Sequence, residues 1–170
     1  VHIIHDGTDI FENGHTIYID GDKMYIAGTR QSSSPNKVCP MALYSLANPE
    51  KPLLLRSINQ DFNIVLVHDM LAVNDTIYTS TGNGGFYIFF YDSVANKFTQ
   101  INSMVSYPNQ GFNHSSAITS DRKTLIFCDE VPRNLSVKVI DIGDVKNLSI
   151  ATTCKANDGA SADNPYIKDN

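Results

Sequence analysis

The sequence contains no tryptophan, only three cysteines, and no run of lysine or arginine. Cys39, Cys128 and Cys154 form no CxxC pair, which excludes a zinc knuckle and a thioredoxin-like motif. The net charge of -5 leaves no basic stripe to hold phosphates, so we expect no nucleic-acid partner. The longest apolar stretches, at 64–67 and 86–91, are far shorter than the roughly 20 residues of a membrane helix, so we expect no transmembrane segment.

An odd number of cysteines means that at least one is unpaired within this chain. Cys128 ends an apolar run at 125–128, so we expect it to be a small, buried hydrophobic residue. A disulfide between Cys39 and Cys154 is the pairing that this leaves open.

The remaining composition is that of a globular protein rich in strands. Hydrophobic residues make up 42% of the chain and charged residues 18%, which argues against a disordered tail. Short β-branched and aromatic runs alternate with Asp, Asn and Gly turns, and no window keeps helical spacing for three turns. We therefore expect an all-β fold.

One order of four strand-like runs recurs with a period of about 50 residues, which is within the range of propeller blades. The sequence therefore predicts a β-propeller with four-stranded antiparallel blades, at residues 15–58, 68–103 and 114–154. The predicted strands are 15–19, 24–28, 41–46 and 53–58 in the first blade, 68–73, 76–80, 86–91 and 97–103 in the second, and 114–119, 124–128, 136–142 and 148–154 in the third.

The two ends of the chain are interpreted as partial flanking blades. Residues 1–5 are predicted as an outer strand and 163–167 as an inner strand, with 163–170 ending inside the next turn. Propeller rings usually need about four to eight blades, so about three complete blades cannot close alone. We expect residues 1–170 to be part of a single propeller domain of a longer protein.

Three segments resemble a known family. They are residues 14–29, where a His-led strand is followed by a hairpin ending in Gly-Thr; 41–52, with its Asn-Pro turn, echoed by 139–147; and 112–130. In these segments the chain resembles the LVIVD-repeat β-propellers, specifically the bacterial choice-of-anchor B family of exported proteins. The resemblance implies a secreted or cell-surface protein associated with the outer membrane.

A histidine begins the innermost strand of each predicted blade: His15, His68 and His114. Such strand starts gather around a propeller axis, so the three imidazoles, helped by Asp69 and Asp163, could bind a divalent metal or an anionic ligand. The structural alternative is that each ring donates its N–H to a carbonyl of the neighbouring blade. Asp163 stands where a further blade would place its histidine.

Two other groups are candidates for function. Tyr107 and Phe112 lie in a connector and could present a sugar- or peptide-binding platform at the channel mouth, or pack over the core. Asp129 and Glu130 are adjacent and point to opposite faces of a strand, so we expect a solvated loop edge there. The Gly-rich run 82–85 lacks the Lys-Ser/Thr of a phosphate loop and is predicted to be a hairpin turn.

Since the distinctive features are architectural, the sequence favours a scaffold or binding module without established catalysis. Its partner would be a protein, a glycan or a small molecule. One alternative is a metal-dependent hydrolase of the lactonase or esterase type with an axial site. Another is a subunit of a cell-envelope assembly.

Overall fold

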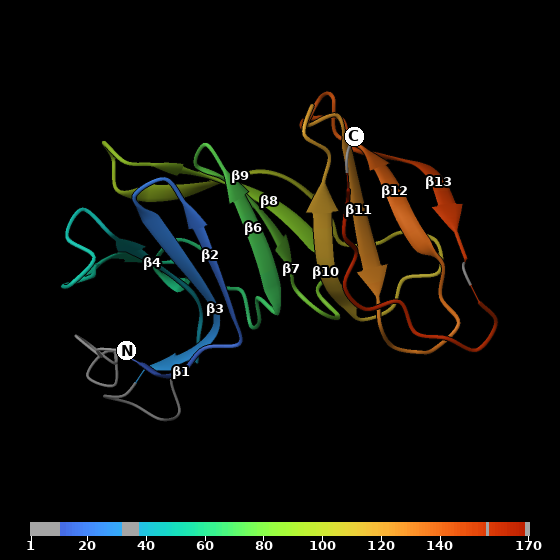
Figure 1. The fold of residues 1–170 in the computed structure, drawn as a ribbon, viewed down its shortest axis with the longest axis horizontal. Helices are drawn as coiled ribbons and strands as arrows, with labels where there is room; N and C mark the ends of the chain where they lie inside the picture. The colour runs from blue at the N-terminus through green and yellow to red at the C-terminus, as the bar shows by residue number, and fades with distance from the viewer. Residues whose placement is uncertain (1–10, 32–37, 156, 169–170) are drawn as a thin grey trace.

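The computed structural model describes residues 11–31, 38–155 and 157–168, so the predicted outer strand at 1–5 lies outside the described residues. The described part is all-β, with three antiparallel sheets that follow one another along the chain (Figure 1). Within these ranges the only helical element is the 3-10 turn η1 (Ile58–Gln60), and no helix is long and apolar enough to cross a membrane.

Each sheet contains four strands that are paired in chain order. The first sheet has β2 (Thr16–Asp20), β3 (Lys23–Gln31), β4 (Val38–Ser45) and β5 (Leu53–Ser57), and the short β1 (Phe11–Asn13) also pairs with β3. The second has β6 (Asp69–Val73), β7 (Thr76–Ser80), β8 (Phe86–Asp92) and β9 (Lys97–Met104). The third has β10 (Asn113–Ile118), β11 (Thr124–Asp129), β12 (Val137–Asp141) and β13 (Ser149–Cys154).

Twelve predicted strands are therefore present close to their expected positions, because alternating side chains and local turn residues set them. The turn between β6 and β7 has Asn74 at φ 50° and Asp75 at φ 61°, the left-handed backbone that tight hairpins need. One expected strand is not formed, since residues 161–168 carry no regular secondary structure.

The three sheets repeat a structural detail that the sequence does not display. The pairing between the third and fourth strands shifts register once in every sheet: between Leu43 and Tyr44, between Ile88 and Phe89, and between Val139 and Ile140. Such bulges increase the local twist of a strand. The sheets are thus repeats of one unit in geometry as well as in strand order.

In the described residues, most of the core lies in two apolar layers between neighbouring sheets. Tyr25 and Leu43 of the first sheet pack in one cluster with Ile77 and Phe89 of the second. The opposite face of the second sheet contributes to the second cluster, in which its residues Tyr78, Phe86 and Ile88 lie with Leu125, Phe127 and Ile140 of the third. The middle sheet is therefore buried on both faces, which explains why β7 and β8 are so rich in aromatic and branched residues.

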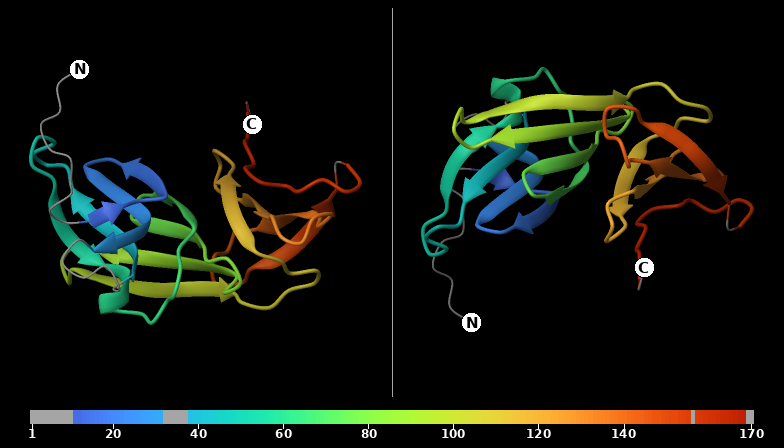
Figure 2. Two further views of the ribbon diagram at one scale, coloured as in Figure 1. Left: turned by 90° about the horizontal axis from the view of Figure 1, so that it is seen from below. Right: turned by 90° about the horizontal axis from the view of Figure 1, so that it is seen from above.

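Packing the sheets face to face brings their first strands together. β2 lies against β6, and β6 lies against β10. The views in Figure 2 show the three sheets side by side in chain order, with these strands on the inner side. We call the end of these strands that carries His15, His68 and His114 the axial mouth.

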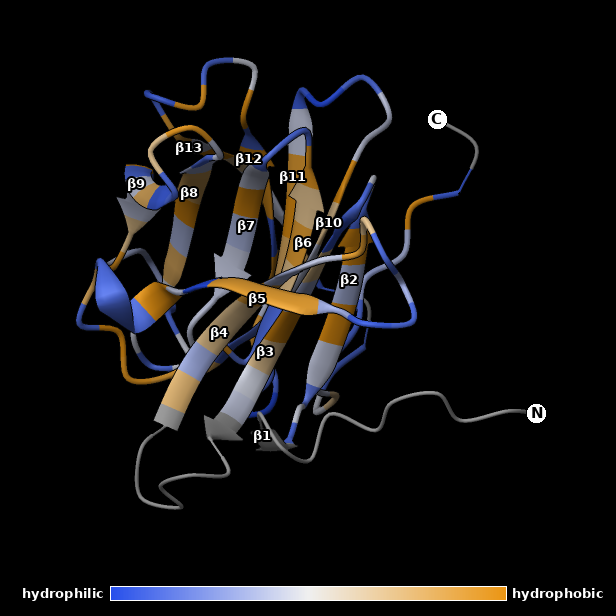
Figure 3. Ribbon diagram, turned by 90° about the vertical axis from the view of Figure 1, so that its left-hand side faces the viewer, coloured by the Kyte–Doolittle hydropathy of each residue, from blue (hydrophilic) through white to orange (hydrophobic). Residues whose placement is uncertain are grey.

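The first sheet also has an apolar face turned away from the second sheet. Ile17 and Ile19 pair with Ile26 and Met24 on that face, and their side chains are 59% and 57% exposed. Hydrophobic stretches of β2 and β5 are visible there in Figure 3. A propeller blade uses this face to pack against the preceding blade.

An ion pair ties the outer edges of the first two sheets together. Arg56 of β5 donates to both carboxylate oxygens of Asp61, at 2.6 and 3.1 Å, and the N–H of Phe98 in β9 donates to the same carboxylate at 2.9 Å. Burial opposes the ionisation of Asp61, but these hydrogen bonds and the positive charges of Arg56 and Lys97 outweigh it. The pKa of Asp61 therefore lies below its usual value.

We predict that Asp61→Asn lowers the free energy of unfolding by about 1–2 kcal/mol at neutral pH, because charged hydrogen bonds at the sheet boundary are weakened. A carboxylate with a lowered pKa stabilises the fold above its unfolded pKa of about 4, and this contribution is lost as the pH falls. Urea unfolding from pH 7 to pH 3 should show the gap between wild type and variant closing below about pH 4. A gap that stays constant over this range would contradict the prediction.

Candidate functional site

The three axial histidines form a ladder of side-chain to backbone contacts. The Nδ1 atom of His15 lies 3.0 Å from the carbonyl oxygen of His68, and Nδ1 of His68 lies 3.1 Å from that of His114. Nδ1 of His114 continues the series, 3.2 Å from the carbonyl oxygen of Asp163. A carbonyl oxygen can only accept, so each Nδ1 carries the proton, and in the neutral ring each Nε2 has a free electron pair.

The rings of the ladder are also in contact. The centroids of His15 and His68 are 4.2 Å apart, and those of His68 and His114 are 4.4 Å apart, each pair tilted by about 50°. Phe112 meets His68 edge-on at 5.2 Å. Burial, which outweighs the hydrogen bond to His114, lowers the pKa of His68, so the middle ring is neutral at pH 7.

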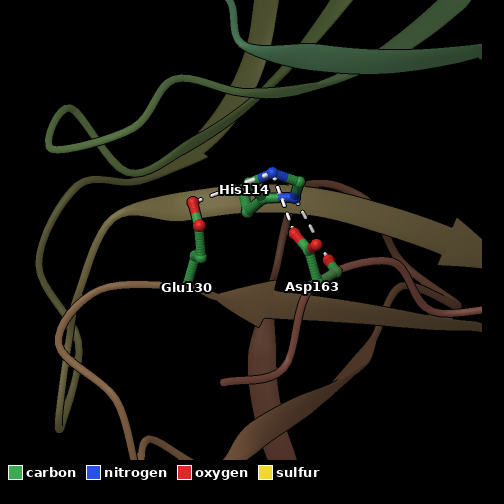
Figure 4. A group of neighbouring side chains, drawn as sticks. All are labelled: His114, Glu130 and Asp163. Atoms are coloured by element: carbon green, nitrogen blue, oxygen red, sulfur yellow. Dashed lines mark hydrogen bonds and ion pairs between the residues drawn. The ribbon is translucent and has the colours of Figure 1, made fainter.

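Asp163 takes the position of the next histidine, as the repeat predicts. Its carbonyl oxygen accepts hydrogen bonds from His114 and from the Ser115 hydroxyl at 2.5 Å. Its carboxylate oxygen Oδ1 lies 2.9 Å from Nε2 of His114, and Oε2 of Glu130 lies 3.8 Å from the same nitrogen. Figure 4 shows the two carboxylates beside the imidazole. Although the segment forms no strand, its first residue is held like a strand start.

A cavity of about 510 Å³ opens between the first strands at the axial mouth. His15, His114 and Asp69 line it, as do two aromatic side chains that the sequence analysis did not single out, Tyr18 and Tyr166. Burial raises the pKa of Asp69, and hydrogen bonds from Met70 and Thr16 oppose this only in part. The remaining lining residues are Thr16, Ile17, Met70, Leu71, Ser115, Ser116, Ala117, Ile118, Asn164, Pro165 and Ile167.

The prediction of a solvated edge at Asp129 and Glu130 is wrong for Asp129. Its carboxylate is completely buried and forms an ion pair of 2.6 Å with the equally buried Lys138. It also accepts from the Tyr107 hydroxyl at 2.8 Å and from the side-chain amide of Asn113 at 3.2 Å. The alternation of side chains holds, however, since Glu130 is directed to His114 instead.

Tyr107 packs in the core, which is the second of the two roles that the sequence left open for it. It is only 9% exposed and its ring lies 5.2 Å from that of Phe127. Burial and the negative charge of Asp129 raise its pKa, so its hydroxyl stays protonated and donates. Phe112 lies nearer the mouth, between His68 and Gly82.

The cysteines are all free, so the Cys39–Cys154 disulfide that the sequence left open does not form. Cys39 is buried and Cys154 is exposed. Cys128 is buried as predicted, and burial raises the pKa of its thiol to about 11. It is therefore an unreactive packing residue.

Repeated four-stranded sheets with their first strands gathered on one side define a β-propeller architecture. Among solved structures, the chain is similar to a luciferin-regenerating enzyme, with a TM-score of 0.57 and 14% sequence identity. The similarity covers 88% of this chain and 48% of that one, so the chain spans about half the length of that enzyme, a six-bladed propeller.

At this identity the similarity shows the fold alone. No family model matches the chain, and no curated protein matches it either. The resemblance to the LVIVD-repeat family therefore remains a prediction from short motifs.

We predict that Lys138→Met lowers the free energy of unfolding by about 3–5 kcal/mol, because Asp129 would be left buried without its cation. The double variant Asp129→Asn/Lys138→Met should recover part of the loss. Lys155→Met is the control, since Lys155 pairs with Asp158 at the surface and its loss should cost less than about 1 kcal/mol. Urea unfolding measures all three, and equal losses for Lys138→Met and Lys155→Met would refute the prediction.

Gly82 and Gly21 offer a matched test of the Phe112 contact. Both have φ near +60°, but a Cβ on Gly82 would lie 2.6 Å from the Phe112 ring, whereas one on Gly21 meets nothing within 4 Å. Gly82→Ala should therefore cost about 1–3 kcal/mol more than Gly21→Ala. It should also shift the NMR signals of His68, which Phe112 contacts. Equal unfolding free energies for the two variants would show that Phe112 is not fixed there.

Proposed function

We propose that this chain is part of a secreted or cell-surface β-propeller that acts as a binding module and takes its ligand at the axial mouth. The observation that carries the proposal is the ladder of His15, His68 and His114, whose Nδ1 atoms are held by backbone carbonyls beside a cavity of about 510 Å³. His15, which lines the cavity and is fixed in this way, is preorganised to accept hydrogen bonds through Nε2.

The chemistry of the lining favours a neutral, hydroxyl-rich ligand such as a glycan. Among the lining residues, the imidazole Nε2 of His15 and the carboxylate of Asp69 are hydrogen-bond acceptors, which suit sugar hydroxyls and disfavour anions. Tyr18 is 36% exposed and Tyr166 is 90% exposed at the same cavity. Such rings can pack against the apolar faces of sugars.

The bacterial surface location and a place in a cell-envelope assembly belong to this proposal. They are supported by the resemblance of residues 14–29, 41–52 and 112–130 to exported propellers.

A second candidate is a metal-dependent hydrolase of the lactonase or esterase type. The grouping of His114, Glu130 and Asp163 favours it, because such side chains can hold a metal that activates water. It differs from the first candidate in requiring turnover of an ester or lactone.

An array of neutral oligosaccharides, followed by calorimetry with the strongest binder, tests the leading proposal. We expect Tyr18→Ala to weaken binding about 3- to 10-fold, because an aromatic contact is removed. Phe90→Ala is the matched control, since Phe90 is 39% exposed and does not line the cavity. The proposal is overturned if no glycan binds, or if both variants bind as wild type does.

A further inference from the structure

Three potential metal ligands from separate parts of the chain meet at the last rung of the ladder. His114 lies on β10, Glu130 follows β11, and Asp163 lies in the segment after β13. One ligand atom from each lies within 4.8 Å of the other two. His114 is 13% exposed and the carboxylates are 39% and 57% exposed, so an ion from solvent could reach them.

The hydrogen bonds of His114 leave one ring nitrogen in conflict with its neighbour. Nδ1 donates to the carbonyl oxygen of Asp163, so in the neutral ring the electron pair of Nε2 faces the carboxylate oxygen at 2.9 Å. Two acceptors at this distance repel unless a proton or a metal ion lies between them. A metal bound at about 2.0–2.2 Å from both atoms removes this repulsion.

The surroundings of His114 match those of a metal-binding histidine. Such histidines almost always donate their second ring nitrogen to a carbonyl or carboxylate, which orients the ring and makes it a better ligand. His114 has this arrangement, and Ser115 fixes the acceptor with a second hydrogen bond of 2.5 Å. The backbone of Asp163 is thus held in place before any ion binds.

The type of ion follows from the ligands. Ca²⁺ and Mg²⁺ prefer oxygen ligands alone, whereas an imidazole with carboxylates suits Zn²⁺ and other first-row divalent metals. Two carboxylates also balance the two positive charges of the ion. Three protein ligands leave one position of a tetrahedral ion open for water or another ligand.

We propose that Nε2 of His114 and the carboxylates of Glu130 and Asp163 form a binding site for one divalent first-row transition metal ion, with Zn²⁺ as the representative. The ion links the third sheet to the segment at 163–167. The site shares the axial mouth with the glycan proposal but depends on neither Tyr18 nor sugar binding.

Calorimetric titration of the full chain with Zn²⁺ tests the proposal, in a His2→Gln/His5→Gln background that removes the two other histidines. We expect one ion per chain, and a loss of affinity of about tenfold or more in Glu130→Gln and in Asp163→Asn. Co²⁺ should give visible absorption that both variants weaken. His15→Gln is the control, since His15 makes the same Nδ1 contact but is not part of the metal group.

Unfolding temperatures in EDTA should be alike for wild type and the two carboxylate variants, and Zn²⁺ should raise that of wild type the most. If wild type takes up no Zn²⁺, or if Glu130→Gln and Asp163→Asn bind it as tightly as wild type, the proposal is wrong. Glycan binding measured in EDTA is decided separately, so failure of one proposal leaves the other standing.

Discussion

The burial of sheet against sheet is the interaction on which the rest of this structure depends. The second sheet is apolar on both faces. Its residues Ile77 and Phe89 are buried on one face, and on the other face its residue Tyr78 packs in one cluster with Phe127 of the third sheet. This packing sets the first strands beside one another, and only then can a histidine at the start of one strand reach the carbonyl of the next. The axial mouth is therefore a consequence of core packing.

Most of the fold could be predicted because its determinants are local. Alternating side chains and turns such as Asn74-Asp75 depend on near neighbours, and the repeat placed His15, His68, His114 and Asp163 in equivalent positions. The histidine ladder follows from the repeat once the sheets are known to pack side by side.

The parts that escaped prediction depend on contacts between distant residues. Lys138 occupies a buried position of β12, like Ile140 two residues later. Only the register that pairs Lys138 with Phe127 brings it to Asp129. Glu130 meets His114 through the pairing of β10 with β11, whereas Asp163 meets it because the segment after β13 returns to β10. Tyr166 lines the cavity for the same reason. No signal in the sequence near these residues indicates such long-range contacts.

The acceptor in every step of the ladder is a backbone carbonyl oxygen, and this has an evolutionary consequence. The carbonyl oxygen of Asp163 accepts a hydrogen bond from His114, just as those of His68 and His114 accept one from the preceding histidine. The side chain of Asp163 is different, but it takes no part in this bond. A residue can therefore be replaced as acceptor without losing the link to the preceding sheet. Selection is free to vary the chemistry presented at one rung while the architecture around the axis is inherited unchanged.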